Sequence, residues 1–153
     1  MVIFNHGSAR ERKSHRVNIS VVRTSSRAGA VFFAIVFAVA FVFGTFRVLV
    51  LVPRIGVFWA VLLEGPVLLT VSWIVARWCV RRFAVPALVG ARALMGVMAF
   101  GLLMAAELGM TLVSGGSVAG QIAGYGSPAG AIGLAAQVTF GVIPVVQIWR
   151  PAR

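Results

Sequence analysis

Charged residues are scarce in this 153-residue chain, and acidic residues are almost missing. Charged residues make up 11% of the sequence, where soluble domains carry about 25%. Three acidic residues stand against fourteen Lys and Arg, so the formal net charge is +11. This composition excludes an ordinary soluble domain. Because 60% of the residues are hydrophobic, we expect an integral membrane protein.

Cysteine and histidine are also rare, and their scarcity argues against disulfide bonds and against Cys/His metal sites. Cys79 is the only cysteine, so no intramolecular disulfide can form. His6 and His15 lie in the polar N-terminal segment, and no Cys/His spacing typical of a metal site occurs. The sequence also has no glycine-rich phosphate loop and no G-x-S-x-G motif. We therefore expect no enzymatic activity, no cofactor and no bound metal.

What the sequence does contain is four apolar stretches, each long enough to cross a bilayer as a helix, which takes about 20 residues. They cover residues 28–52, 55–76, 88–113 and 129–149. The glycine- and serine-rich segment 114–129 separates the last two. The predicted fold is an all-α membrane protein, a four-helix transmembrane bundle of up-down-up-down topology over residues 28–150.

Basic residues alternate between the connecting segments in the way that sets membrane orientation. Many lie in residues 1–27, one or two around Arg54, three or four between Arg77 and Arg92, none in 114–129, and two after Trp149. Basic segments beside the spans stay in the cytoplasm. We therefore expect both termini on the cytoplasmic side.

Residues 1–27 are polar and basic, and we expect them to form a disordered cytoplasmic tail. Such a tail can contact anionic lipid, where each basic residue near the surface contributes about 1 kcal/mol. We expect no nucleic acid partner, because setting the membrane orientation accounts for the excess of positive charge.

Three ionisable side chains fall well inside the predicted spans, namely Arg47, Glu64 and Glu107, and Arg92 lies near the start of the third span. Such a residue usually has a partner or a function, because burying it in hydrocarbon is costly. A rise of ~1.5 Å per residue puts Arg47 about 9 Å and Glu64 about 13 Å below the outer surface, so we expect an ion pair. Glu107 has no second arginine at its depth. It would share Arg47, be protonated or face water.

Gly65 and Pro66 directly follow Glu64. A proline inside a helix leaves the carbonyl four residues earlier without its donor, so we expect a helix break here. In transporters a broken helix beside a carboxylate often marks an ion or substrate site. An arginine within reach favours a structural ion pair instead, and this is our first hypothesis.

Small residues recur at every fourth position in two of the spans. These stripes are Ala30, Ala34 and Ala38 in the first span and Gly101, Ala105 and Gly109 in the third. They allow close contact between helices inside a membrane. We expect that contact within the bundle, with contact between copies as the alternative.

The segment 44–78, about a quarter of the chain, resembles a family of small four-span bacterial inner-membrane proteins of unknown function. The resemblance is carried by Gly44-Thr45-Phe46-Arg47, Leu51-Val52-Pro53-Arg54-Ile55-Gly56, Glu64-Gly65-Pro66, Ser72 and Ala76-Arg77-Trp78. It implies a location in the bacterial inner membrane and implies no activity.

Two functions fit these features. The first is a non-enzymatic accessory or interaction protein, whose buried charges hold the bundle together or bind a larger membrane-protein partner. The second is a small oligomeric proton-coupled transporter or channel in which Glu64 carries the proton. The expected protein partners are thus a larger membrane protein, which supports the first function, or further copies of the chain in a homo-oligomer, which support the second.

Reporter fusions test the predicted topology. Alkaline phosphatase needs disulfides, which form outside the cytoplasm. A fusion within residues 114–129 should therefore be active, and a fusion after Arg82 should be inactive. The reverse pattern of activities would overturn the topology.

Overall fold

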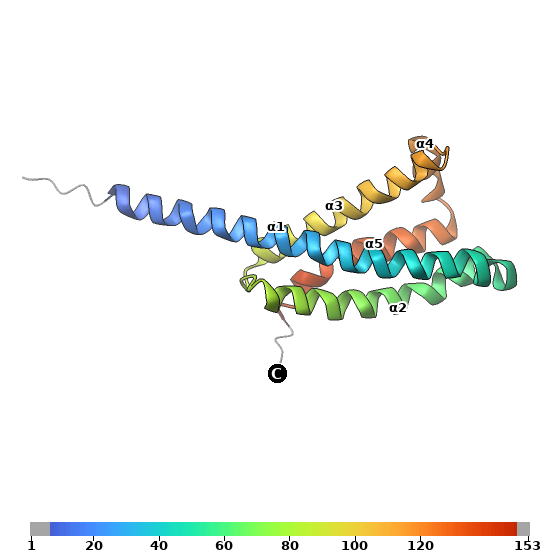
Figure 1. Cartoon of the computed structure of the whole chain (residues 1–153), viewed down its shortest axis with the longest axis horizontal. Helices are drawn as coiled ribbons and strands as arrows, with labels where there is room; N and C mark the ends of the chain where they lie inside the picture. Colours follow the sequence, from blue (N-terminus) through green and yellow to red (C-terminus); the bar gives the residue numbers. More distant parts are fainter. Residues whose placement is uncertain (1–6, 150–153) are drawn as a thin grey trace, which may run out of the picture.

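The computed structural model describes residues 7–149, with side chains from Asn18 onward, and this part of the chain is helical without strands. The elements are α1 (Gly7–Phe46), the π-helix η1 (Arg47–Leu51), α2 (Val52–Arg82), α3 (Val89–Val113), α4 (Val118–Gly124) and α5 (Pro128–Val146). Figure 1 shows the long helices α1, α2, α3 and α5 lying beside one another. The prediction of an all-α helical bundle is confirmed.

Three helical stretches are long and apolar enough to cross a membrane, namely Asn18–Arg82, Val89–Val113 and Pro128–Val146. The first stretch consists of two antiparallel arms, α1 and α2, which Figure 1 shows joined at one end. The backbone leaves the helical region at Gly56, where φ is 78° and ψ is 165°. Glycine adopts such angles without a steric penalty, since it has no Cβ.

Residues 7–27, predicted to be disordered, instead begin α1, so this prediction is wrong for the described residues. No glycine or proline interrupts residues 8–28, so a helix formed by the apolar part extends outward at one hydrogen bond per residue. Ser25 and Ala28 are fully buried, and the end of this segment therefore belongs to the bundle. Residues 1–6 and 150–153 and the side chains before Asn18 lie outside the described part, so lipid contact by the tail stays a prediction.

The long helices pack in a ring. The packed pairs are α1 with α2, α2 with α5, α5 with α3, and α3 with α1. Two ends of the bundle can therefore be distinguished. The closed end contains the connection 83–88, and the open end contains the turn at Gly56 and the helix α4, toward which α3 diverges from α2 (Figure 1).

Glycines bring α3 into backbone contact with two neighbours toward the closed end. A Cβ added to Gly29 would lie 2.5 Å from the carbonyl oxygen of Met95, and one added to Gly96 would collide with the carbonyl oxygen of Gly141. The buried core lies around these contacts. Its residues are Ala28, Phe32, Val36, Ala76, Cys79, Val85, Ala91, Met95, Ala99, Phe140 and Ile143.

Buried polar side chains add hydrogen bonds at the closed end. Nε2 of Gln147 donates to the carbonyl of Trp73 at 2.8 Å and links α5 to α2. Nε of Arg92 donates to the carbonyl of Pro86 at 3.0 Å and holds the connection against the start of α3. Such bonds stabilise the fold because a buried donor without an acceptor is costly.

The two small-residue stripes do not pack within the bundle, so that expectation is wrong. Ala30, Ala34 and Ala38 are exposed, as are Gly101 and Ala105. A Cβ added to Gly101 or Gly109 meets nothing within 4 Å. A four-residue period marks one face of a helix, but it does not say which face turns inward.

The segment 114–129 contains the short helix α4 in addition to turns. Oγ of Ser117 accepts from the backbone N–H of Gly120, and Oγ of Ser127 accepts from that of Gly130, each at 3.0 Å. These are helix N-caps, which satisfy donors that the first helical turn leaves free. The serines therefore start α4 and α5.

A pair of alanine substitutions tests the packing of α3. Gly96→Ala should lower the free energy of unfolding by about 1–3 kcal/mol, the usual cost of overpacking, because its methyl group meets the backbone of α5. Gly101→Ala is the matched control and should leave stability equal or slightly higher, since that position faces open space. Thermal unfolding in detergent measures both. Equal stability of the two variants would contradict the contact at Gly96.

Candidate functional site

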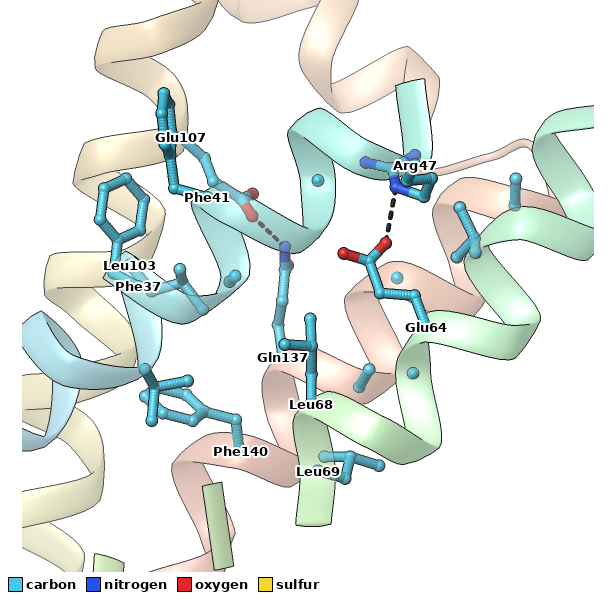
Figure 2. Close-up of a pocket in the computed structure, with 18 of the residues that line it drawn as sticks. Phe37, Phe41, Arg47, Glu64, Leu68, Leu69, Leu103, Glu107, Gln137 and Phe140 are labelled. Atoms are coloured by element: carbon cyan, nitrogen blue, oxygen red, sulfur yellow. Dashed lines mark hydrogen bonds and ion pairs between the residues drawn. The ribbon is translucent and has the colours of Figure 1, made fainter. Parts of the chain in front are cut away.

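The open end of the bundle contains a cavity of about 770 Å³. Its lining comes from α1, η1, α2, α3 and α5, and most of it is apolar (Figure 2). Its largest apolar side chains include Phe37, Phe41, Leu68, Leu103 and Phe140. A cavity of this size lies within the range of about 300–1,000 Å³ typical of small-molecule sites.

Small residues of α5 explain why side chains do not fill this space. Gly130, Gly133 and Ala136 line the cavity, and none of them can reach across to α1. At the inner limit Phe32 and Phe140 stack with ring centroids 4.4 Å apart. Because Phe140 lines the cavity and Phe32 is fully buried, this stack separates the cavity from the core of the closed end.

Arg47 and Glu64 form an ion pair on one wall of the cavity. Nε of Arg47 lies 2.6 Å from Oε2 of Glu64, and the side chains are 27% and 11% exposed. Arg47 lies nine residues before Gly56 and Glu64 eight residues after it. The turn at Gly56 therefore places the two residues beside each other on the antiparallel arms. The ion pair expected from their similar predicted depths is confirmed.

Arg47 is also the first residue of η1, a feature that the sequence reasoning missed. The backbone N–H of Val52 donates to the carbonyl of Arg47, so the turn holds one residue more than an α-helical turn. π-helical turns are rare and occur frequently at functional sites. The residues of η1 do not predict a π-helical turn, because Val48–Leu51 are apolar residues that an α-helical span also contains.

Glu107 and Gln137 meet on another wall of the cavity. Nε2 of Gln137, on α5, donates a hydrogen bond to Oε1 of Glu107, on α3. Figure 2 shows Gln137 lying between Glu107 and the Arg47–Glu64 pair. Glu107 therefore does not share Arg47, one of the three outcomes expected for it. The sequence signal that could have identified Gln137 is that it is one of two amide side chains in an otherwise apolar span.

The helix break predicted at Gly65 and Pro66 is absent. The backbone of α2 stays helical through both residues, and its non-helical angles occur at Gly56 instead. A proline removes one backbone hydrogen bond, and apolar helices tolerate this where neighbouring groups compensate. Gly65 lines the cavity beside Glu64.

The charged groups of the cavity leave one carboxylate without a cation. The charge of Arg47 balances that of Glu64, whereas the described partner of Glu107 is a neutral amide. Among the described residues, no group of three His, Cys, Asp or Glu could hold a metal ion. The apolar lining with these few polar groups suits the binding of a molecule that would compensate the charge of Glu107.

Removing one member of the ion pair should destabilise the protein. Glu64→Gln leaves the guanidinium of Arg47 unpaired, and breaking a buried pair in this way typically costs about 3–5 kcal/mol. Arg47→Met should cost less, because an unpaired carboxyl can take up a proton whereas a guanidinium stays charged. The double variant Arg47→Met, Glu64→Leu should recover most of the loss.

Abundance in membranes and thermal unfolding in detergent measure these effects. Arg54→Met is the matched control, because among the described residues Nη1 of Arg54 donates to the carbonyl of Val50, one turn away, and Arg54 forms no ion pair. It should leave stability unchanged. A Glu64→Gln protein as abundant and as stable as the wild type would show that the pair is not structural.

Comparisons with known proteins do not identify this arrangement. No family model matches the chain, and neither a curated protein nor a solved structure matches it. The function is therefore argued from the cavity and from the side chains that line it.

Proposed function

We propose that this chain is a multi-pass protein of the bacterial inner membrane, with four spans and both termini in the cytoplasm. Two observations support a membrane location. The helical stretches are long and apolar enough to cross a membrane, and basic residues concentrate in alternate segments. The bacterial inner membrane is what the resemblance of residues 44–78 implies.

Within the membrane the protein acts as an accessory or interaction protein without enzymatic activity of its own. The ion pair between Arg47 and Glu64 carries this proposal. An ion pair with N and O 2.6 Å apart ties α2 to the start of η1 and neutralises the carboxylate that a proton carrier would need free. The favoured role of the pair is to hold the two arms together.

The outward stripes of α1 and α3 support an interaction role. Ala34 and Ala105 lie at the middle of stripes that no other part of the described chain covers. Small side chains at four-residue spacing let a second helix approach closely inside a membrane. The partner we propose for these faces is a transmembrane helix of a larger membrane protein.

One observation favours a second function. Glu64 and Glu107 both line the cavity, where a small oligomeric proton-coupled transporter or channel would place its carboxylates. In that case Glu64 carries the proton, and Glu64→Gln removes flux while leaving folding intact. The stability of that variant therefore separates the two functions.

Purification in a mild detergent, followed by mass spectrometry, tests the interaction role. We expect a stoichiometric larger membrane protein to copurify, and Ala34→Leu should release it because the larger side chain fills the stripe. Ala135→Leu, at an exposed position of α5 outside both stripes, is the control. A clean homodimer would favour the transporter, and a monomer without a partner would contradict the proposal.

A further inference from the structure

The wall of the cavity around Glu107 is rich in hydrogen-bond acceptors and lacks a cation. Glu107 lies partly buried against Gln137, whose own oxygen, Oε1, is buried without a hydrogen-bond partner. Among the described residues, the ion pair that forms at the cavity uses Glu64. When Glu107 is ionised, the lining therefore carries one negative charge that no side chain of the described chain compensates.

Aromatic rings cover the wall beside this carboxylate. Phe33, Phe37 and Phe41 follow one another along α1, with ring centroids 5.2 Å and 6.5 Å apart, and all three line the cavity. Figure 2 shows Phe37 and Phe41 on the same side of the cavity as Glu107 and Leu103. The face of an aromatic ring attracts a cation, and the attraction is strongest where water is excluded.

We propose that the cavity binds an organic monocation whose charge is carried on an apolar body. Glu107 serves as its counter-ion, and the rings of Phe37 and Phe41 contact its apolar surface. An ionised Glu107 selects this class of ligand, because it repels an anion and is not compensated by a neutral molecule, whereas a bound cation compensates its charge and favours the ionised form over the protonated one. The volume of about 770 Å³ suits a molecule of drug size.

Two other occupants fit the same space poorly. A helix about 10 Å wide with a rise of ~1.5 Å takes up roughly 120 Å³ per residue, so the cavity would hold only about six residues of a partner helix. A hard metal cation such as calcium needs about six to eight oxygen ligands. The wall at Glu107 offers one carboxylate and one amide. The site is also separate from the outward stripes, so it adds to the proposed interaction role and does not depend on it.

A pair of ions with the same shape and opposite charge tests the proposal. The full chain, purified in a neutral maltoside detergent, is titrated by equilibrium dialysis with tetraphenylphosphonium and, separately, with tetraphenylborate. We expect saturable binding of one phosphonium cation per chain and no saturable binding of the borate. Glu107→Gln, which keeps a hydrogen bond to Gln137, should weaken phosphonium binding at least tenfold. Glu107→Asp should retain most of it.

Aromatic variants supply a second test that does not alter a charge. Phe37→Leu should weaken phosphonium binding several-fold, because it removes a ring from the lining. Phe46→Leu is the matched control, since Phe46 is exposed on the same helix and does not line the cavity. Equal phosphonium affinity in the wild type and in a folded Glu107→Gln variant, or equal binding of the two ions, would overturn the proposal. If Glu107→Gln does not fold, the Phe37 and Phe46 variants and the borate titration decide.

The ammonium group that pairs with Glu107 can belong to a free organic cation or to the zwitterionic headgroup of an aminolipid. Adding phosphatidylethanolamine as a competitor separates the two sources, with phosphatidylglycerol of the same acyl chains as the control. Displacement of the phosphonium by the first lipid alone assigns the site to an aminolipid. No displacement by either lipid assigns it to a free organic cation.

Discussion

The contact of α3 with its two neighbours at Gly29 and Gly96 determines the shape of this molecule. Backbone meets backbone at both points, so α1, α3 and α5 cannot separate toward the closed end. Toward the open end α5 turns Gly133 and Ala136 inward, and these residues cannot keep that contact. The helices diverge, and the cavity is the consequence. Its position therefore depends on where the chain places its smallest residues.

The two ends of the bundle are stabilised in different ways. Most of the buried apolar residues lie at the closed end, where dispersion and the removal of apolar surface from water stabilise the fold. At the open end the contacts across the cavity include two polar pairs, Arg47 with Glu64 and Glu107 with Gln137. Polar pairs are strong where water is excluded, and an unpaired member is correspondingly costly. The open end is thus the more sensitive to the loss of a single side chain.

The sequence predicted the features that follow from the number of residues along a helix. It missed those that depend on how each helix is rotated about its own axis. The level of Arg47 and Glu64 follows from rise per residue, and the ends of α3 follow from the length of an apolar stretch. Which stripe turns inward depends on how each helix is rotated, and Gly101 has the same spacing as residues that do pack. The reversal was predicted between residues 52 and 55, next to the observed non-helical angles at Gly56, whereas the helix break predicted at Gly65 and Pro66 does not occur.

The ion pair between Arg47 and Glu64 makes Glu107, rather than Glu64, the carboxylate that is available to bind a ligand. Position in the sequence drew attention to Glu64, because a glycine and a proline follow it. In the structure Glu64 has the guanidinium of Arg47 at 2.6 Å, and the backbone of α2 is helical at Glu64 and at the two residues that follow it. The charge of Glu64 is therefore compensated within the fold. Glu107 has no such partner, and the described side chain that contacts it is itself left with a buried, unpaired oxygen. When Glu107 is ionised, the charge that balances it must come from outside the described chain, and the aromatic side chains of α1 lie on that same side of the cavity.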